Sequence, residues 1–361
     1  MPETSPEPAG SRHSTVRHRA ARFEDRVHGI RARCARRRGH VPTVIPYVGY
    51  GSNGWVRVLC RVLLSKPARG EERSERRNPR EGIRGWRSFT SVPVGDVDVT
   101  IEVGGQRIEV PADRGGVVDT RVPVDLTPGW HVATLRAAGS APVEAQIHVI
   151  DAATEFGIIS DVDDTVMVTA LPRPLLAAWN TFVLDEHARI PTPGMAVLFE
   201  RLAREHPGAP VIYLSTGAWN VAPALSRFLA RNLYPLGPLL LTDWGPTHDR
   251  WFRSGRAHKE ENLRRLAEEF PAMRWLLVGD DGQHDEELYA RFAEEYPDRV
   301  AAVAIRRLST GEAVLAGGRT NIGGPAADVP WVSAGDGSTL ADGLAEAGIM
   351  RDEDAGPRTD A

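Results

Sequence analysis

Acidic side chains follow a short apolar run near the middle of this chain, at a spacing that can carry chemistry. Asp161, Asp163 and Asp164 come soon after the run that begins at Phe156. Carboxylates buried side by side repel one another, so such a cluster is costly unless a cation lies among them. Taken alone, the stretch is explained more simply as an acidic turn or a helix N-cap. The residues that accompany the other apolar runs decide between this explanation and a cation site.

Further polar side chains lie at the ends of later apolar runs or beside them. These residues are Ser215, Thr216, Lys259, Asp280 and Asp285. Because the carboxyl ends of parallel strands meet at one edge of a sheet, the sequence predicts that these residues lie near Asp161. Lysine occurs only twice in the chain, at Lys66 and Lys259. A lysine at this edge therefore indicates a position that requires a compact ammonium group.

Phosphoryl transfer is the chemistry that needs this set of groups. Carboxylates from two separate strands are hard oxygen ligands, and they indicate an open Mg²⁺ site rather than a zinc site. One carboxylate can attack phosphorus to form an aspartyl-phosphate, and a second, two residues later, can protonate the leaving oxygen and then activate water. A hydroxyl and an ammonium group can neutralise the oxygens of the phosphoryl group during transfer.

Each of these residues also has an ordinary structural explanation. Ser215 alone is typical of a turn, and Asp280 and Asp285 are typical of a solvated loop followed by a helix N-cap. A helix is predicted to begin with His258 and Lys259, and the positive end of its dipole would disfavour a lysine there. This unfavourable placement of Lys259, together with the order of the features along the chain, favours the functional interpretation.

Strands and helices alternate over residues 151–310, which we expect to form the catalytic domain. The expected strands are the apolar runs at 156–159, 211–214, 239–241, 275–278 and 300–305. Helical periodicity lies between these runs, which predicts an α/β fold with a doubly wound parallel sheet. Residues 166–194 interrupt the alternation, and we expect them to form a small cap over the edge of the sheet.

A small all-β sandwich domain is predicted over residues 44–150, because apolar and polar residues alternate there in short runs. The run at 97–103 leads through Gly104 and Gly105, a hairpin signal, into the next expected strand. Residues 66–87 are rich in charge, and we expect them to form a loop.

The two ends of the chain are predicted to be less ordered. Residues 1–43 are rich in arginine and poor in apolar residues, which predicts a basic disordered tail. Residues 311–361 are rich in glycine and alanine, and we expect a partly disordered C-terminal extension with a short helix over 339–347.

Composition narrows the class of protein. The 361 residues carry a net charge of -4, which gives no general attraction to nucleic acid. The two cysteines, Cys34 and Cys60, suit a reducing compartment. No apolar run reaches the roughly 18 residues that a membrane span requires, so we expect a cytoplasmic protein. The arginine-rich tail would favour peripheral contact with anionic membranes, although a solvated extension is the simpler explanation.

On four motifs, the chain resembles the haloacid dehalogenase superfamily of phosphohydrolases. These motifs are Asp161–Thr165 (DVDDT), the strand-end Ser215, Lys259, and Gly279–Asp285 (GDDGQHD). More narrowly, the region from about 155 to 310 resembles the phosphatidate phosphatase catalytic domain of the actin patch protein. The finer matches are Asn180–Val183, Trp219, Thr242–Gly245, His258–Lys259 and Gly282–Asp285.

The resemblance implies which groups carry the reaction and hold the metal. Asp161 would be the nucleophile, and it would hold Mg²⁺ together with Asp280 and the main chain of Asp163. The side chain of Asp163 would be the general acid and base. Asp285 would support the metal directly or through water.

The resemblance also implies that Ser215, Thr216 and Lys259 bind the phosphoryl group, and that Thr165 braces the turn after the first strand.

Two departures from the family pattern concern the substrate. Thr216 begins a Thr-Gly-Ala sequence where the family more often has further serine or asparagine and then proline. Asp281 stands where a serine is usual, which would add charge beside the metal. The substrate therefore stays open between phosphatidate and a soluble phosphomonoester.

Two other classes of function remain open. A phospho-receiver signalling module also combines aspartates, a hydroxyl and a lysine on a parallel sheet. The second carboxylate at Asp163 and the position of Asp161 on the first strand favour an enzyme instead. A binding scaffold that acts through residues 44–150 is the third class, and its protein partners are not predictable from the sequence.

Overall fold

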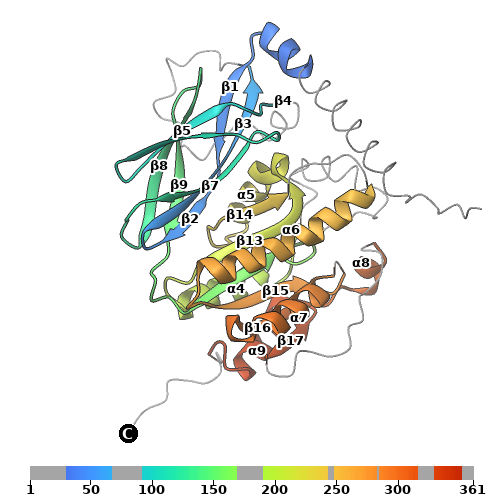
Figure 1. Ribbon diagram of the computed structural model, residues 1–361. Helices are drawn as coiled ribbons and strands as arrows, with labels where there is room; N and C mark the ends of the chain where they lie inside the picture. Colours follow the sequence, from blue (N-terminus) through green and yellow to red (C-terminus); the bar gives the residue numbers. More distant parts are fainter. Residues whose placement is uncertain are drawn as a thin grey trace, which may run out of the picture.

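The computed structural model of the protein describes residues 30–66, 92–168, 190–242, 248–282, 284–315 and 329–351. Within these ranges the chain forms a largely β half that ends near Ile150 and an α/β half that begins at Phe156 (Figure 1). Almost all of the charged loop expected at 66–87 lies outside the described residues.

The N-terminal half is one hydrogen-bonded sheet built around a long strand, β3. Its described strands are β1 (Val41–Pro46), β2 (Gly49–Ser52), β3 (Trp55–Ser65), β4 (Val92–Pro93), β5 (Asp98–Val103), β6 (Gln106–Pro111), β7 (Val117–Pro123), β8 (Gly129–Ala137) and β9 (Val143–Val149). β1 and β2 pair with one edge of β3, and β4 and β7 pair with the other. Because β2 also pairs with β9, the strands β9, β8, β5 and β6 continue the same sheet.

The sequence predicted a small all-β sandwich domain for this half. The largely β character of the half is confirmed, but β2 joins the two groups of strands into one sheet. The sheet folds over itself, so that β1 lies against β8 and β9. Small and branched apolar side chains such as Val58, Ile101 and Leu135 fill the space enclosed. Because apolar and polar residues alternate along the strands, every second side chain points into this core.

Regular structure begins before the predicted boundary at residue 44. Residues 30–37 form a helix, and β1 begins at Val41. Ala35 of this helix is buried in the core of the β half. The expected disordered tail therefore does not extend over residues 30–43, and its residues 1–29 lie outside the described part of the chain.

Six described strands form the parallel sheet of the C-terminal half. They are β10 (Phe156–Asp161), β13 (Val211–Ala218), β14 (Leu239–Thr242), β15 (Arg274–Asp280), β16 (Val300–Arg306) and β17 (Trp331–Ala334). Their spatial order is β14-β13-β10-β15-β16-β17, so the chain builds outward from β10 in one direction and then in the other. β10 and β15 are neighbours at this reversal, which is where open parallel sheets bind their ligands.

Helices cover both faces of the parallel sheet (Figure 1). They are α4 (Met195–Glu205), α5 (Ala222–Arg231), α6 (His248–Glu269), α7 (Asp285–Glu295), α8 (Thr310–Leu315) and α9 (Gly337–Glu346). α6 and α7 contact each other on one face, and α4 and α9 contact each other on the opposite face. Every residue of β16 is buried, as expected for a strand covered on both sides. The prediction of an α/β fold with a parallel sheet is confirmed.

Among the described helices, none has the length and apolar character needed to span a membrane.

Residues 329–351 belong to the α/β half and do not form a separate extension. β17 pairs in parallel with β16, and α9 packs on α4, β16 and β17. The helix expected over 339–347 corresponds to α9. The α/β half therefore extends beyond the domain boundary predicted at residue 310.

The segment expected to form a cap is framed by a two-stranded ladder. β11 (Met167–Val168) and β12 (Ile190–Pro191) pair as antiparallel strands at its two ends. Residues 169–189 between them lie outside the described residues, so the cap stays a prediction.

The two halves of the molecule share one apolar core. Tyr47, Tyr50 and Trp55 of the β half pack among residues of the α/β half. The ring of Tyr47 stacks on Trp219 with the centroids 4.8 Å apart, and its hydroxyl donates to the Trp219 carbonyl oxygen. Because Trp219 comes directly after β13, the β half contacts the strand that carries Ser215.

Candidate active site

Asp161 is the last residue of β10 and the first residue of a tight turn. Within the turn the Val166 N–H donates to the Val162 carbonyl oxygen, and Asp164 adopts the left-handed conformation, with φ 57°. The Thr165 hydroxyl donates to Asp161 Oδ2 over 3.4 Å. The turn thus brings Thr165 back to Asp161, and the bracing role that the resemblance implies for Thr165 stays a prediction.

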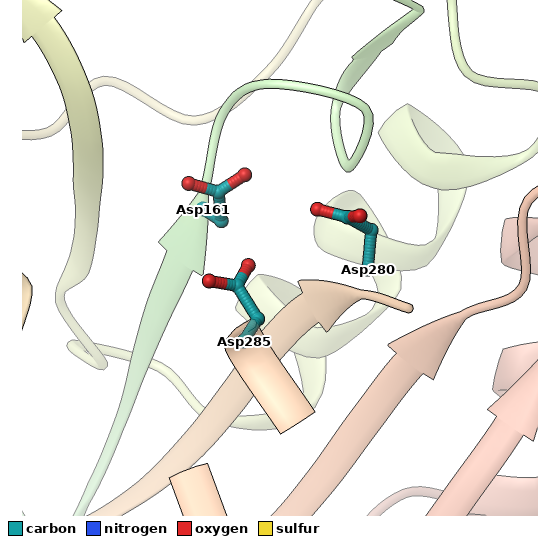
Figure 2. Close-up of side chains that lie close together, drawn as sticks. All are labelled: Asp161, Asp280 and Asp285. Carbon is teal, nitrogen blue, oxygen red and sulfur yellow. The ribbon is translucent and has the colours of Figure 1, made fainter. Parts of the chain in front are cut away.

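Three carboxylates from three elements converge at the carboxyl end of the sheet (Figure 2). Asp161 ends β10, Asp280 ends β15 and Asp285 begins α7. One oxygen atom of each lies within 4.8 Å of the others, and all three side chains are almost completely buried. The pairing of β10 with β15 therefore brings Asp161 beside two carboxylates that are far from it in the sequence.

Lys259 lies between two of these carboxylates. Its Nζ atom is 2.7 Å from Asp161 Oδ1 and 2.5 Å from Asp285 Oδ1. The helix that carries it, α6, begins at His248 and not at His258 as predicted, so Lys259 is in the middle of a helix. The argument from an unfavourable helix end was therefore wrong, and the position of Lys259 is explained by its two ion pairs.

Ser215 and Asp163 form a second pair beside the cluster. The Ser215 hydroxyl donates to Asp163 Oδ2 over 2.9 Å and accepts from the Gly217 N–H. The pairing register of β13 with β14 shifts between Leu214 and Ala218, so β13 is irregular where Ser215 lies. The side chain of Asp163 belongs to this pair and not to the three-carboxylate cluster, so only its main chain remains a candidate metal ligand.

Thr216 occupies a different environment from its neighbour. It is half-buried, and α6 approaches it so closely that a Cβ at Gly255 would lie 3.0 Å from Thr216 Cγ2. The Thr216 carbonyl oxygen accepts from the hydroxyl of Thr242 over 2.9 Å. Substrate binding by Thr216 stays a prediction.

The electrostatic state of the site is dominated by burial. Burial raises the pKa values of Asp161 and Asp280 well above the ordinary range, and the neighbouring carboxylates raise them further. Burial also raises the pKa of Asp163, to about 7, although the hydrogen bond from Ser215 acts in the opposite direction. Burial lowers the pKa of Lys259, but the ion pairs with Asp161 and Asp285 outweigh it and raise that pKa overall. One ammonium group thus faces an excess of carboxylates.

The donor set fits a hard divalent cation. Asp280 Oδ2 and Asp285 Oδ2, which belong to the three-carboxylate cluster, are buried and accept no hydrogen bond from the described residues. Buried polar atoms without a partner are costly, and carboxylate oxygens are the ligands that Mg²⁺ prefers. The second oxygen of Asp280 accepts from the Gly282 N–H over 2.6 Å, which fixes the direction of the first.

Three residues that shape the site had no role assigned from the sequence. Gly279 permits Asp285 to approach β15, because a Cβ there would lie 2.8 Å from Asp285 Oδ2. Thr242 fixes the end of β13 through its hydroxyl, and a polar residue at a strand end was the available signal. Arg306, which is buried and donates to the Asp164 carbonyl oxygen, had no signal among so many arginines.

Asp281 makes contacts that the sequence did not predict. The sequence suggested that it adds charge beside the metal. In the structure its Oδ1 accepts from the Leu308 N–H over 2.8 Å, and its own N–H donates to the Arg306 carbonyl oxygen. Asp281 therefore joins the ends of β15 and β16.

Comparison with known families assigns a catalytic domain to the segment that contains these residues. Residues 156–307 match the family model described as "Phosphatidate phosphatase APP1, catalytic domain". The matched segment is less than half of the chain, and it contains each of the predicted site residues. The comparison supports a phosphoric monoester hydrolase domain in this segment.

Two curated relatives match over a similar share of the chain. "Phosphatidate phosphatase APP1" of Saccharomyces cerevisiae is 28% identical over 154 residues, covering 42% of this chain and 25% of the relative. An uncharacterised protein of Schizosaccharomyces pombe is 27% identical over 158 residues, covering 41% of this chain and 24% of that protein. The match thus spans about a quarter of the length of these relatives.

Solved structures give weaker likenesses. A carbohydrate acetylesterase from Xanthomonas citri is 12% identical, with a TM-score of 0.28, over 85% of this chain and 75% of that chain. A likeness at this level supports no inference about fold or function.

Proposed function

We propose that the α/β half is a Mg²⁺-dependent phosphatase that transfers a phosphoryl group first to Asp161 and then to water. The observation that carries the proposal is the convergence of Lys259 and the buried carboxylates at the reversal point of the parallel sheet. The match of residues 156–307 to a phosphatase catalytic domain supports it. A doubly wound sheet of the haloacid dehalogenase type is part of the proposal, and the strand order supports that assignment.

Asp161 is the proposed nucleophile. Its carboxylate is directed into the cluster and lies 2.7 Å from the Lys259 ammonium. Burial raises the pKa of Asp161, and the ammonium acts against this effect in favour of the ionised form needed for attack. An Asp161 oxygen forms a bond to phosphorus as the ester P–O bond breaks. Water then attacks the same phosphorus atom, which releases inorganic phosphate and regenerates the Asp161 carboxylate.

Asp163 is the proposed proton carrier. In the first step it donates a proton to the leaving alkoxide oxygen, and in the second it accepts a proton from the attacking water. A pKa raised to about 7 by burial suits transfer in both directions near neutral pH. The hydrogen bond from Ser215 orients the carboxyl group for this role.

Asp161, Asp280 and Asp285 would hold the cation, together with the main chain of Asp163. When bound, Mg²⁺ would neutralise the negative charge of the phosphoryl oxygens. Ser215, Thr216 and Lys259 would bind the phosphoryl group, and Thr165 would hold the Asp161 side chain in place through its hydroxyl.

Phosphatidate is the substrate that we propose first, because the matched family and the yeast relative are both named for it. A soluble phosphomonoester is the alternative, since the chemistry at Asp161 is common to both. Peripheral contact with an anionic membrane is proposed with the lipid substrate. The arginine-rich residues 12–38 would supply the charge for it.

Phosphate release from phosphatidate vesicles and from a panel of soluble phosphomonoesters tests the proposal. We expect Mg²⁺-dependent release that is abolished by a chelator and reduced at least about a thousandfold in Asp161→Asn, since the nucleophile is lost. Activity that survives both treatments would show that Asp161 and the cation are not required. Stable phosphorylation without turnover would favour the phospho-receiver instead.

A further inference from the structure

Arg306 is a buried arginine at the candidate active site. It is the last residue of β16, it lies opposite Asp280 in the sheet register, and only 5% of its side chain is exposed. Burying a guanidinium group is costly unless its N–H groups are paired. The partners of Arg306 therefore indicate what the residue does.

Arg306 joins three segments that surround the site. Its Nη1 donates to the Asp164 carbonyl oxygen over 2.7 Å, and its Nη2 donates to Glu312 Oε1 over 2.7 Å. Its own carbonyl oxygen accepts from the Asp281 N–H over 3.1 Å. Arg306 thus contacts the turn after β10, the loop after β15 and helix α8.

The Asp164 peptide is a sensitive point of the turn. Asp164 has φ 57°, a left-handed conformation that is uncommon for residues with a side chain, although aspartate tolerates it better than most. Its N–H donates to the Met167 carbonyl oxygen over 2.8 Å, and its carbonyl oxygen accepts from Arg306. Because the backbone N–H and carbonyl oxygen of Asp164 are both hydrogen-bonded, the positions of Asp163 before it and Thr165 after it are fixed.

Glu312 holds Arg306 from the other side. Its Oε1 accepts from Arg306, and its Oε2 accepts from the Ser309 N–H over 2.8 Å at the start of α8. Burial raises the pKa of Glu312, but the hydrogen bonds from Arg306 and Ser309 outweigh it, so that pKa lies below its ordinary value. Glu312 is therefore an ionised anchor near neutral pH.

We propose that Arg306 is a positioning residue that holds the turn from Asp161 to Thr165 in the geometry that binds the divalent cation and aims Asp163. The inference rests on the proposed function and adds a residue to it. Lysine cannot replace arginine here, because its single ammonium lacks two separate donors in a fixed fork. Changing a residue that orients metal ligands typically costs 10–100-fold in metal affinity or activity.

The test compares Arg306→Lys with Arg307→Lys in the full-length protein. Arg307 is the matched control, because it is the next residue and its Nε donates to Ser333 Oγ at the exposed surface. Calorimetric titration with MgCl₂ alone measures metal affinity, and hydrogen exchange of the segment 156–168 reports the order of the turn. For Arg306→Lys we expect Mg²⁺ affinity and kcat to fall at least about tenfold, with KM within about twofold and faster exchange. For Arg307→Lys all of these should stay within about twofold of the unchanged protein.

The outcomes separate this inference from the function on which it rests. Unchanged Mg²⁺ affinity and exchange in a folded Arg306→Lys variant would overturn the inference alone. If that variant does not fold, Glu312→Gln replaces it, since the amide keeps the shape and removes the charge that anchors Arg306. Mg²⁺ affinity reduced about threefold or more in Glu312→Gln supports the inference, and unchanged affinity overturns it. An unchanged protein that binds no Mg²⁺ overturns the proposed function, and the inference with it.

Discussion

Gly279 controls how closely α7 approaches the end of β15. A Cβ at this position would lie 2.7 Å from Tyr289 Cε2 and 2.8 Å from Asp285 Oδ2. Tyr289 is completely buried, and its hydroxyl donates to the Val278 carbonyl oxygen, so it has little room to move. The place of Asp285 in the carboxylate cluster therefore depends on the missing side chain at residue 279.

Replacing this glycine should weaken the metal site and the fold together. We expect Gly279→Ala to lower Mg²⁺ affinity about tenfold and to destabilise the protein by about 1–3 kcal/mol, because Asp285 and Tyr289 must shift. Calorimetry and thermal unfolding measure the two effects. Gly311→Ala is the control, since a Cβ there would meet open space. Equal Mg²⁺ affinity in the two variants would contradict this role of Gly279.

Asp163 should make the stability of the metal-free protein depend on pH. Burial raises the pKa of its carboxyl group from 3.8 to about 7. The folded chain therefore binds this proton more tightly than the unfolded chain. The resulting stabilisation is complete below about pH 4 and is lost as the pH rises through about 7.

We therefore expect Tm in the presence of a chelator to fall between pH 5 and pH 7.5. The fall should be smaller in Asp163→Asn by at least about 3 °C, because the amide does not titrate in this range. Scanning calorimetry of the two proteins across this interval is the measurement. Identical falls in Tm would show that Asp163 titrates near its ordinary pKa in the folded protein.

Residue types were predictable at this site, whereas their partners were not. Asp161, Asp163 and Asp280 could be placed at one edge because strand ends are visible in the sequence. The hydrogen bond from Ser215 to Asp163 depends on an irregular end of β13, which no local pattern indicates. The second ion pair of Lys259, with Asp285, depends on the distance between α6 and α7.

Among the elements, α6 shows why a helix start is hard to predict. The expected start at His258 followed from apolar spacing that becomes regular only after that residue. The helix begins at His248, in a stretch whose sequence is mostly polar and basic. In the helix interior the N–H groups are paired with the preceding turn, so the field of the helix end does not reach Lys259.

β17 and α9 were missed as parts of the catalytic half for a different reason. The Gly- and Ala-rich sequence before them is typical of a linker, and β17 has only four residues. Their place is decided by long-range packing. Gly337, at the start of α9, lies directly against the backbone of Gly194, the residue that precedes α4.

This contact can be tested with one methyl group. We expect Gly337→Ala to destabilise the protein by about 1–3 kcal/mol, because its Cβ would overlap backbone atoms of Gly194 and Met195. Gly335→Ala, where a Cβ meets open space, should change stability by less than about 0.5 kcal/mol. Urea unfolding of the two variants gives the comparison. A Gly337→Ala protein as stable as the control would mean that α9 is only loosely attached.

At the scale of the whole molecule, an ion-pair network joins the β half to α6. Glu269 accepts from the Tyr50 hydroxyl over 2.8 Å and from Arg57 Nε over 3.2 Å. Arg57 also pairs with Asp119 over 2.5 Å, and Arg265 of α6 pairs with the same Asp119 over 2.8 Å. Since α6 carries Lys259, these contacts connect the β half to the active site. These contacts give the β half a structural role, and a role in binding a partner remains a hypothesis.

Removing one charge from the network should weaken the contact between the halves. Glu269 has only 7% of its side chain exposed, so Glu269→Gln leaves Arg57 with one charged partner in a poorly solvated place. We expect a loss of about 1–3 kcal/mol in the free energy of unfolding. The exposed neighbour Glu268 provides the control, and Glu268→Gln should cost less than about 0.5 kcal/mol. Equal denaturant midpoints would mean that the network contributes nothing to stability.

The central claim is that Asp161 carries the phosphoryl group. Acid quenching of the protein during turnover with Mg²⁺ and substrate, followed by mass spectrometry of its peptides, tests this directly. We predict one phosphoryl group on the peptide that contains Asp161, absent from Asp161→Asn and from protein treated with a chelator. Phosphorylation that persists in Asp161→Asn, or substrate hydrolysis at a full rate with no phosphorylated peptide, would contradict it.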